Sequence, residues 1–127
     1  MATLKHSFIS ILFLASCAIA GESSDIYVEN TLEKCVAINS KSLMYFGDMP
    51  LLKMDISHIS EIGNCGCKSA ISSYTVFQTI AGHESLLMLG EFTFLWQKEL
   101  DLPIAVQKQL IAKLADVKIV IACSNSQ

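Results

Sequence analysis

Apolar and polar residues alternate along several stretches of the chain, and this period of two is typical of half-buried β-strands. The alternation is regular at 52–58 and at 117–123. Residues 70–80 are rich in Thr, Tyr, Val, Phe and Ile, which favours a third strand. In 86–96 every second residue is apolar except Gly90, which predicts the clearest long strand, with a bulge or bend at the glycine. Turn residues separate these strands at intervals of about ten residues, so the sequence predicts an all-β fold, a small Ig-like β-sandwich.

The remaining segments have weaker patterns. We expect a strand to begin at 26–28 and a second strand at 30–39. The segment 40–50 contains Gly, Asp and Pro and is expected to be a loop, and 98–101 is expected to be a connector. Residues 104–115 follow a proline and place apolar side chains at roughly helical spacing, which predicts one short helix.

The first twenty residues have the layout of a secretory signal. One lysine and no acid precede the apolar run 7–14, and small residues follow it. This run is too short for a membrane span, which needs about 20 apolar residues. Two cleavage sites overlap: an A-x-A motif at 18–20 would leave Gly21 as the first residue, and a lipobox ending at Cys17 would make that cysteine the lipidated N-terminus. We therefore expect a signal peptide at 1–20 and a single exported domain at 21–127.

Charge and composition narrow the range of partners. The chain has twelve acidic residues, nine Lys and no Arg, and its formal net charge is −3. Removal of the signal takes away one Lys and no acid, which leaves a charge of about −4 on the domain. A mildly acidic chain without Arg has neither the guanidinium groups that bind phosphate through two hydrogen bonds nor a basic patch. We therefore expect no nucleic-acid partner. Contact with a membrane is expected only through a lipid on Cys17.

Four cysteines remain in the exported domain, and they predict two disulfides. Cys65 and Cys67 flank only Gly66, so a bridge between them would close a small, strained ring. Each is therefore expected to pair with a distant partner, one with Cys35 and the other with Cys123, in either combination. Gly66 is expected to supply backbone freedom between the two fixed sulfur atoms.

Two other uses of the cysteines are open. Soft sulfur ligands select Cu(I), and a periplasmic copper site could be built from Met54, His58, Cys65 and Cys67. The competing interpretation is that Met54 fills the core and that His58 lies at its edge. Thiol-redox chemistry is the second use, but it normally relies on Cys-x-x-Cys at a helix N-terminus, which the chain lacks. The chain also lacks a nucleophile elbow, a phosphate loop and a zinc-protease motif, so we expect neither an enzyme nor a cofactor.

Several segments resemble a bacterial family. These are the run V-E-N-x-L-x-x-C at 28–35, the C-G-C-K-S-A segment at 65–70 with Tyr74 after it, L-P-I-A at 102–105 and I-V-I-A-C at 119–123. The pattern is similar to a family of small exported bacterial proteins catalogued as domain of unknown function 2195. The resemblance spans nearly the whole exported domain, and its specific part is the Cys-Gly-Cys-Lys-Ser segment. It implies a protein of the bacterial envelope and transfers no catalytic residue.

Together these features predict a non-catalytic binding or structural accessory module. It would reside in the periplasm, or at the outer membrane if Cys17 is lipidated, and act on a protein partner in the cell envelope that the sequence does not identify.

Overall fold

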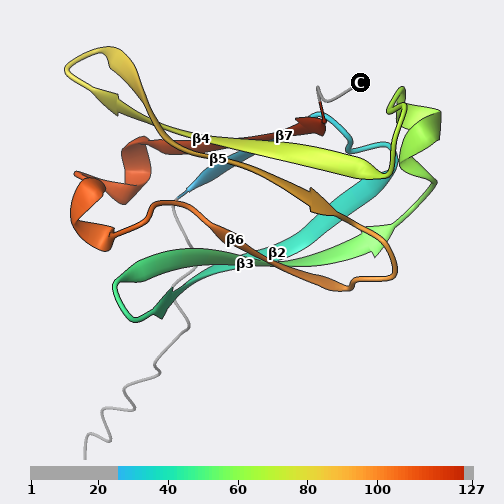
Figure 1. Cartoon of the computed structure of the whole chain (residues 1–127), viewed down its shortest axis with the longest axis horizontal. Helices are drawn as coiled ribbons and strands as arrows, with labels where there is room; N and C mark the ends of the chain where they lie inside the picture. The colour runs from blue at the N-terminus through green and yellow to red at the C-terminus, as the bar shows by residue number, and fades with distance from the viewer. Residues whose placement is uncertain (1–25, 125–127) are drawn as a thin grey trace, which may run out of the picture.

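The computed structural model describes residues 26–124, which fold into two packed β-sheets (Figure 1). One sheet has the strand order β1-β7-β4-β5 and the other has the order β2-β3-β6, and all pairs are antiparallel except β1 with β7. The strands are β1 Tyr27–Asn30, β2 Val36–Phe46, β3 Met49–His58, β4 Ile71–Ile80, β5 His83–Thr93, β6 Glu99–Pro103 and β7 Val117–Cys123. The predicted all-β sandwich is thus confirmed. The segment 1–20, which is predicted to be a signal peptide, lies with Cys17 outside the described residues.

The core lies between the two sheets and is formed by every second side chain of their regular strands. In β3 the buried residues include Leu52, Met54 and Ile56, and in β7 they are Val117, Ile119 and Ile121. Burial of a large aliphatic side chain contributes about 1.5–3 kcal/mol, so these regular strands supply much of the driving force for folding. The strands predicted at 52–58, 70–80 and 117–123 are the ones with this alternation, and the structure confirms all three.

Two disulfides lie at one end of the sandwich and fasten the connection between β3 and β4. Cys35, just before β2, is bonded to Cys65, and Cys67 is bonded to Cys123 at the end of β7. This settles the combination that the sequence left open. Gly66 lies between the two bridges with a φ of +93°, in the left-handed region, which confirms its predicted role. The short 3₁₀ turn η1 (Ile62–Cys65) precedes it.

The predicted loop at 40–50 is wrong. This segment is a hairpin of β2 and β3, closed by a tight turn at Gly47 and Asp48, where Gly47 has a φ of +60°. The pattern misled because β2 is an edge strand whose second half is largely exposed, so its apolar residues do not alternate. The expected strand at 30–39 is also displaced, since 31–35 form a turn. The expected connector at 98–101 is the beginning of β6, where Leu100 is buried between two exposed acids.

The structure also corrects the helix predicted at 104–115. Ile104 and Ala105 are buried in extended backbone, and two 3₁₀ turns follow, η2 (Lys108–Leu110) and η3 (Leu114–Asp116). The buried side chain of Gln78 explains why no helix forms. Its Nε2 donates to the carbonyl oxygen of Leu110 at 2.9 Å, and its Oε1 accepts from the amide of Ala112 at 3.2 Å. These bonds occupy backbone groups that an α-helix would pair within itself.

The long strand predicted at 86–96 is confirmed only in part. β5 ends at Thr93, and its bulge lies near Leu87 rather than at Gly90. The bulge takes Leu86 off the inner face, where it is 58 % exposed, and Trp96, which lies beyond the end of the strand, is 95 % exposed. Gly90 has a different role, because a Cβ added there would lie 2.4 Å from Cε1 of Tyr74. The glycine leaves room for that buried ring.

Candidate functional site

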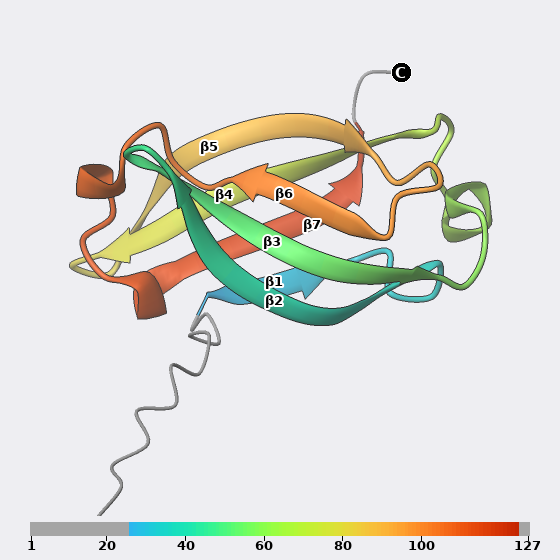
Figure 2. The same cartoon turned by 90° about the horizontal axis from the view of Figure 1, so that it is seen from below.

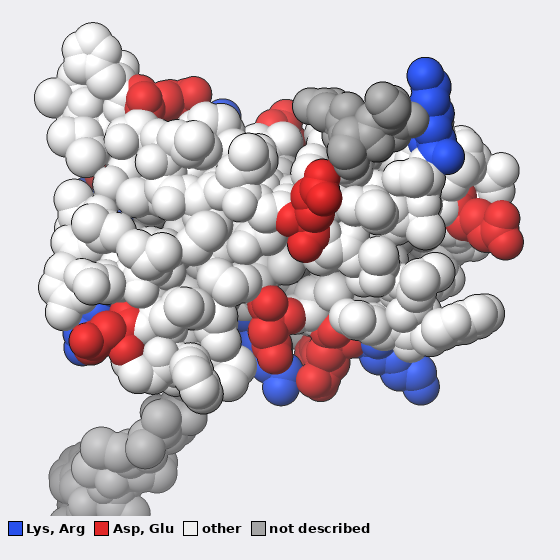
Figure 3. Space-filling model, viewed as in Figure 1, with Lys and Arg blue, Asp and Glu red and all other residues white. Residues whose placement is uncertain are grey.

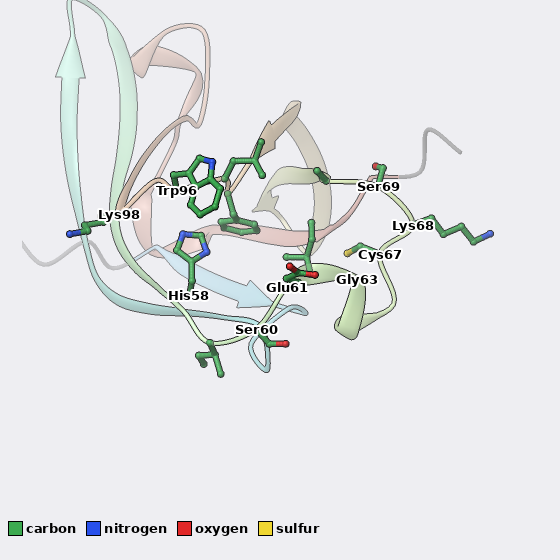
Figure 4. Close-up of a pocket in the computed structure, with 14 residues that line it drawn as sticks. His58, Ser60, Glu61, Gly63, Cys67, Lys68, Ser69, Trp96 and Lys98 are labelled. Carbon is green, nitrogen blue, oxygen red and sulfur yellow. The ribbon is translucent and has the colours of Figure 1, made fainter.

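A pocket of about 720 Å³ opens at the disulfide end of the sandwich. One wall is formed by the end of β3 and the segment that follows it, 58–63, and the other by 94–98 between β5 and β6. Residues 67–70 close the third side, between η1 and β4. The lining is mainly apolar, and the volume is in the range of small-molecule sites, about 300–1,000 Å³. Figure 4 shows that these segments, which are distant in sequence, surround one space.

Trp96 is the most exposed large side chain of this wall and stands on unusual backbone. A tight turn connects Phe94 to Gln97, whose amide donates to the Phe94 carbonyl oxygen at 3.1 Å. Trp96 is the third residue of that turn and has a φ of +51°. Glycine or asparagine is preferred at such positions, because a Cβ in the left-handed region costs about 1–2 kcal/mol. Strain of this kind concentrates at functional sites, which directs attention to the tryptophan.

Buried aromatic contacts hold the turn in place. Phe94 is buried, and its ring meets the Phe92 ring edge-on with 4.8 Å between centroids. The His58 ring approaches Phe94 in the same manner at 6.5 Å. His58 also donates from Nε2 to the carbonyl oxygen of Gln97 at 2.7 Å, which links the end of β3 to the turn. The position of Trp96 is thus determined by its neighbours rather than by its own packing.

The opposite wall is fixed by the first disulfide. The backbone amides of Ile59 and Ser60 both donate to the carbonyl oxygen of Cys35, at 2.8 and 3.1 Å. Cys35 in turn is bonded to Cys65 of η1. Cys67 lines the pocket itself, and its second bridge anchors the third side to β7. Both walls are therefore tied to the core, which gives the pocket a defined shape.

Three charged residues line the pocket, and their side chains take different positions relative to it. Figure 4 shows the carboxylate of Glu61 in the middle of the labelled group, whereas the side chains of Lys68 and Lys98 extend outward on opposite sides. On the face of the molecule shown in Figure 3, charges of both signs are scattered around a largely uncharged surface, and the described residues there form no continuous basic patch.

The copper hypothesis named Met54, His58, Cys65 and Cys67, and the structure places these residues in different surroundings. Met54 is fully buried in the core, as its core-filling interpretation predicts. It precedes His58 by four positions on one strand, which corresponds to roughly 13 Å. Both cysteines are in disulfides, so neither is a thiolate. In residues 26–124 no group of three His, Cys, Asp or Glu side chains is arranged to hold a metal.

Copper binding through thiolates and thiol-redox chemistry therefore remain hypotheses about a reduced form of the protein. The mass of the native protein after alkylation, with and without reduction, tests them. Unmodified cysteines before reduction mean that the bridges are closed, and alkylated Cys65 and Cys67 would favour a thiol function.

The sequence patterns did not identify two exposed apolar residues of the pocket lining, Trp96 and Leu95. They assigned Trp96 to the apolar face of a strand, and the turn at 94–97 reverses that assignment. Nothing in the local sequence marks this turn, since it contains no Gly, Pro, Asn or Asp. His58 was identified as a candidate metal ligand and, in the competing interpretation, as a histidine at the edge of the core, but not as a link between two walls.

The fold and the pocket define a class: a small β-sandwich with two disulfides and an apolar pocket at the bridged end. Residues 11–126 match a family described as "uncharacterized protein conserved in bacteria" (DUF2195), and the chain belongs to this family. Comparison with curated proteins found no match, and comparison with solved structures found none either.

Two further findings concern location. Disulfides persist outside the reducing cytosol, so the two bridges suggest a non-cytoplasmic protein. Among residues 26–124, no helix is long and apolar enough to cross a membrane.

Proposed function

We propose that the protein is a non-catalytic binding module of the bacterial envelope and that the pocket at its bridged end is the binding site. The observation that carries the proposal is the tryptophan: 95 % of Trp96 is exposed, on left-handed backbone, beside a concave apolar surface. An exposed apolar surface of this kind, held by two covalent bridges, is a typical recognition site.

The polar groups of the pocket support binding rather than catalysis. Nε2 of His58 is occupied by the Gln97 carbonyl, and the Ser60 hydroxyl accepts a hydrogen bond from Nδ2 of Asn64 at 2.7 Å. In the described part of the chain, no hydrogen bond joins His58 to the hydroxyl of Ser60 or Ser69. A nucleophile next to its base is the arrangement that acyl transfer needs.

The test uses the fluorescence of Trp96, which is the only tryptophan of the chain. The probe is octyl glucoside, a neutral amphiphile, added below its micellar concentration to the native disulfide-bonded protein. We expect a saturable blue shift of the emission, because the indole passes from water into contact with the alkyl chain. An emission spectrum that does not respond would overturn the proposal.

Two leucine variants provide the matched comparison. Leu95 lines the pocket and is 54 % exposed, whereas Leu89 lies on β5 outside the pocket and is 66 % exposed. Leu95→Ala is expected to weaken binding of octyl glucoside several-fold, and Leu89→Ala is expected to leave it unchanged. Both variants keep Trp96 as the reporter. Equal weakening by both would indicate non-specific adsorption.

A further inference from the structure

We infer that the pocket selects ligands in which an apolar body carries a cationic ammonium group. The inference rests on the proposed function and adds the chemical class of the ligand. Its basis is the combination of an exposed indole, a carboxylate in the middle of the lining residues and two outward ammonium groups around a single apolar space.

Glu61 supplies the negative charge. The ion pairs among the described residues join Lys53 to Glu99, Lys108 to Asp48 and Lys118 to Glu84. The Glu61 carboxylate takes part in none of them, and it makes no side-chain hydrogen bond at the start of η1. It stands at the pocket without a cation from residues 26–124, and a ligand ammonium would provide one.

The two lysines at the rim do not cancel this charge inside the pocket. Lys68 and Lys98 both line it, but Figure 4 shows their side chains extending into solvent, away from Glu61 and Trp96. Their long side chains and strongly hydrated ammonium groups favour this outward position. Among the lining residues, the negative charge of Glu61 therefore lies between the two positive charges, which extend outward.

Trp96 supplies the second attraction. The face of an indole binds cations better than that of any other side chain, with about 0.5–2 kcal/mol per contact. The Trp96 ring is almost fully exposed, so its faces are free for a ligand. His58 beside it is held by the hydrogen bond from Nε2 to the Gln97 carbonyl oxygen. The pocket thus presents a π-face and a carboxylate.

The size of the pocket requires more than a small cation. A volume of about 720 Å³ greatly exceeds that of one ammonium group, and the exposed side chains of Ile59 and Leu95 form apolar walls. An alkyl chain or ring attached to the cation would cover these walls. We therefore assign a cationic amphiphile or arylalkyl amine as the ligand class.

The experiment compares three probes with the same chain: octyltrimethylammonium, octyl glucoside and octyl sulfate, each below its micellar concentration. Calorimetric titration of the full exported protein at low salt is expected to give the tightest binding for the cation, about tenfold tighter than the neutral probe. The anion is expected to bind most weakly. Equal affinities for all three would overturn the ligand class but leave the proposed function standing, and absence of binding by all three would overturn both.

Charge-neutral variants separate the pocket from the general field of the protein. Glu61→Gln is expected to remove most of the preference for the cation while leaving the affinity for octyl glucoside unchanged. Asp116→Asn removes an equal charge at the opposite end of the sandwich, in η3, and is expected to keep the preference. If both variants lowered it equally, the selectivity would arise from net charge, and the assignment to Glu61 would be wrong.

Replacement of the indole tests the π contact. Trp96→Leu keeps an apolar side chain, so we expect it to reduce the affinity for octyltrimethylammonium more than that for octyl glucoside. Circular dichroism of the variant checks that the fold is retained. Vesicles of phosphatidylglycerol and phosphatidylethanolamine form the last arm: an emission shift with vesicles but with no soluble probe would identify a lipid surface instead and overturn the inference.

Discussion

The two ends of the sandwich are held together in different ways. The pocket end, with η1 and the turn at 94–97, is fastened by two disulfides. The far end, with η2, η3 and the turn between β4 and β5, depends on hydrogen bonds from the buried side chain of Gln78. Figure 2 shows these ends at opposite sides of the molecule. Both ends carry exposed apolar residues, among them Trp96 at the pocket end and Leu110 at the far end, but the disulfides lie only at the pocket end.

Each end also contains one non-glycine residue with a φ of +51°, but the two positive φ values have different causes. Ala81 lies in the two-residue turn between β4 and β5, followed by Gly82 at +80°. Such hairpin turns require positive φ at both positions, because only then does the turn match the twist of the strands. Trp96 lies in a connection between sheets, where no hairpin imposes this conformation. The positive φ at Ala81 is therefore explained by the hairpin, whereas the positive φ at Trp96 belongs to a turn held by the contacts of Phe94 and His58.

Removal of one bridge is the most severe test of this comparison. We expect the double variant Cys67→Ala, Cys123→Ala to lose about 4 kcal/mol of unfolding free energy, because the bridge closes a loop of 56 residues in the unfolded chain. Urea unfolding of the oxidised protein measures the loss. The same measurement on Cys35→Ala, Cys65→Ala should give a similar value, since loop entropy depends only weakly on length. A loss below about 1 kcal/mol for both would mean that the bridges do not stabilise the pocket end.

At the far end, the single side chain of Gln78 is expected to contribute to the unfolding free energy. Gln78→Ala removes the partners of the Leu110 carbonyl and the Ala112 amide, and we expect a loss of about 2 kcal/mol. Hydrogen exchange should show faster exchange of the Ala112 amide. Gln107→Ala, an exposed glutamine in the same connection, is the control and should change stability little. An unchanged stability in Gln78→Ala would show that the far end is held by other contacts.

Glycine substitutions compare the two strained positions directly. Trp96→Gly and Ala81→Gly each relieve a residue at a φ of +51°, and we expect each to raise stability by roughly 1 kcal/mol, less the entropy that glycine gains in the unfolded chain. Only Trp96→Gly should abolish the binding of octyl amphiphiles, measured by calorimetry. If Trp96→Gly destabilised the protein instead, the indole would stabilise the fold. The strained position would then not lower stability for the sake of ligand binding.

The sequence predicted those parts of the fold in which one face of a strand is buried. β3, β4 and β7 alternate because their inner faces meet the core, and a burial period of two is visible in the sequence. Only the first part of β2 was expected to be a strand, since residues 44–46 at its end are exposed on both faces and show no such period. The helix expected at 104–115 was replaced by two 3₁₀ turns because of the distant Gln78, which no local pattern reveals.

The candidate site was less predictable than the fold. The four cysteines and the role of Gly66 followed from the spacing, but the pairing of Cys35 with Cys65 depends on which loop lies beside the start of β2. The turn that exposes Trp96 results from the burial of Phe94, which contacts Phe92 two residues before it and His58 at the end of the distant strand β3. Tertiary contacts of this kind determine the pocket, and they are absent from any single segment.

The smallest expected effect concerns Tyr74, which connects the sheets midway between the two ends. Its hydroxyl donates to the Pro103 carbonyl oxygen at 2.9 Å, and burial raises the pKa of this phenol above its usual value of 10.0. Folding therefore favours the protonated form: the stabilisation is complete below about pH 10 and is lost as the pH rises through the higher pKa of the folded state. Unfolding free energies measured between pH 9 and pH 11 should fall in the native protein and stay flatter in Tyr74→Phe. Tyr45→Phe removes an exposed phenol and should keep the decline of the native protein. If the decline persisted in Tyr74→Phe, another group would cause the loss of stability at alkaline pH.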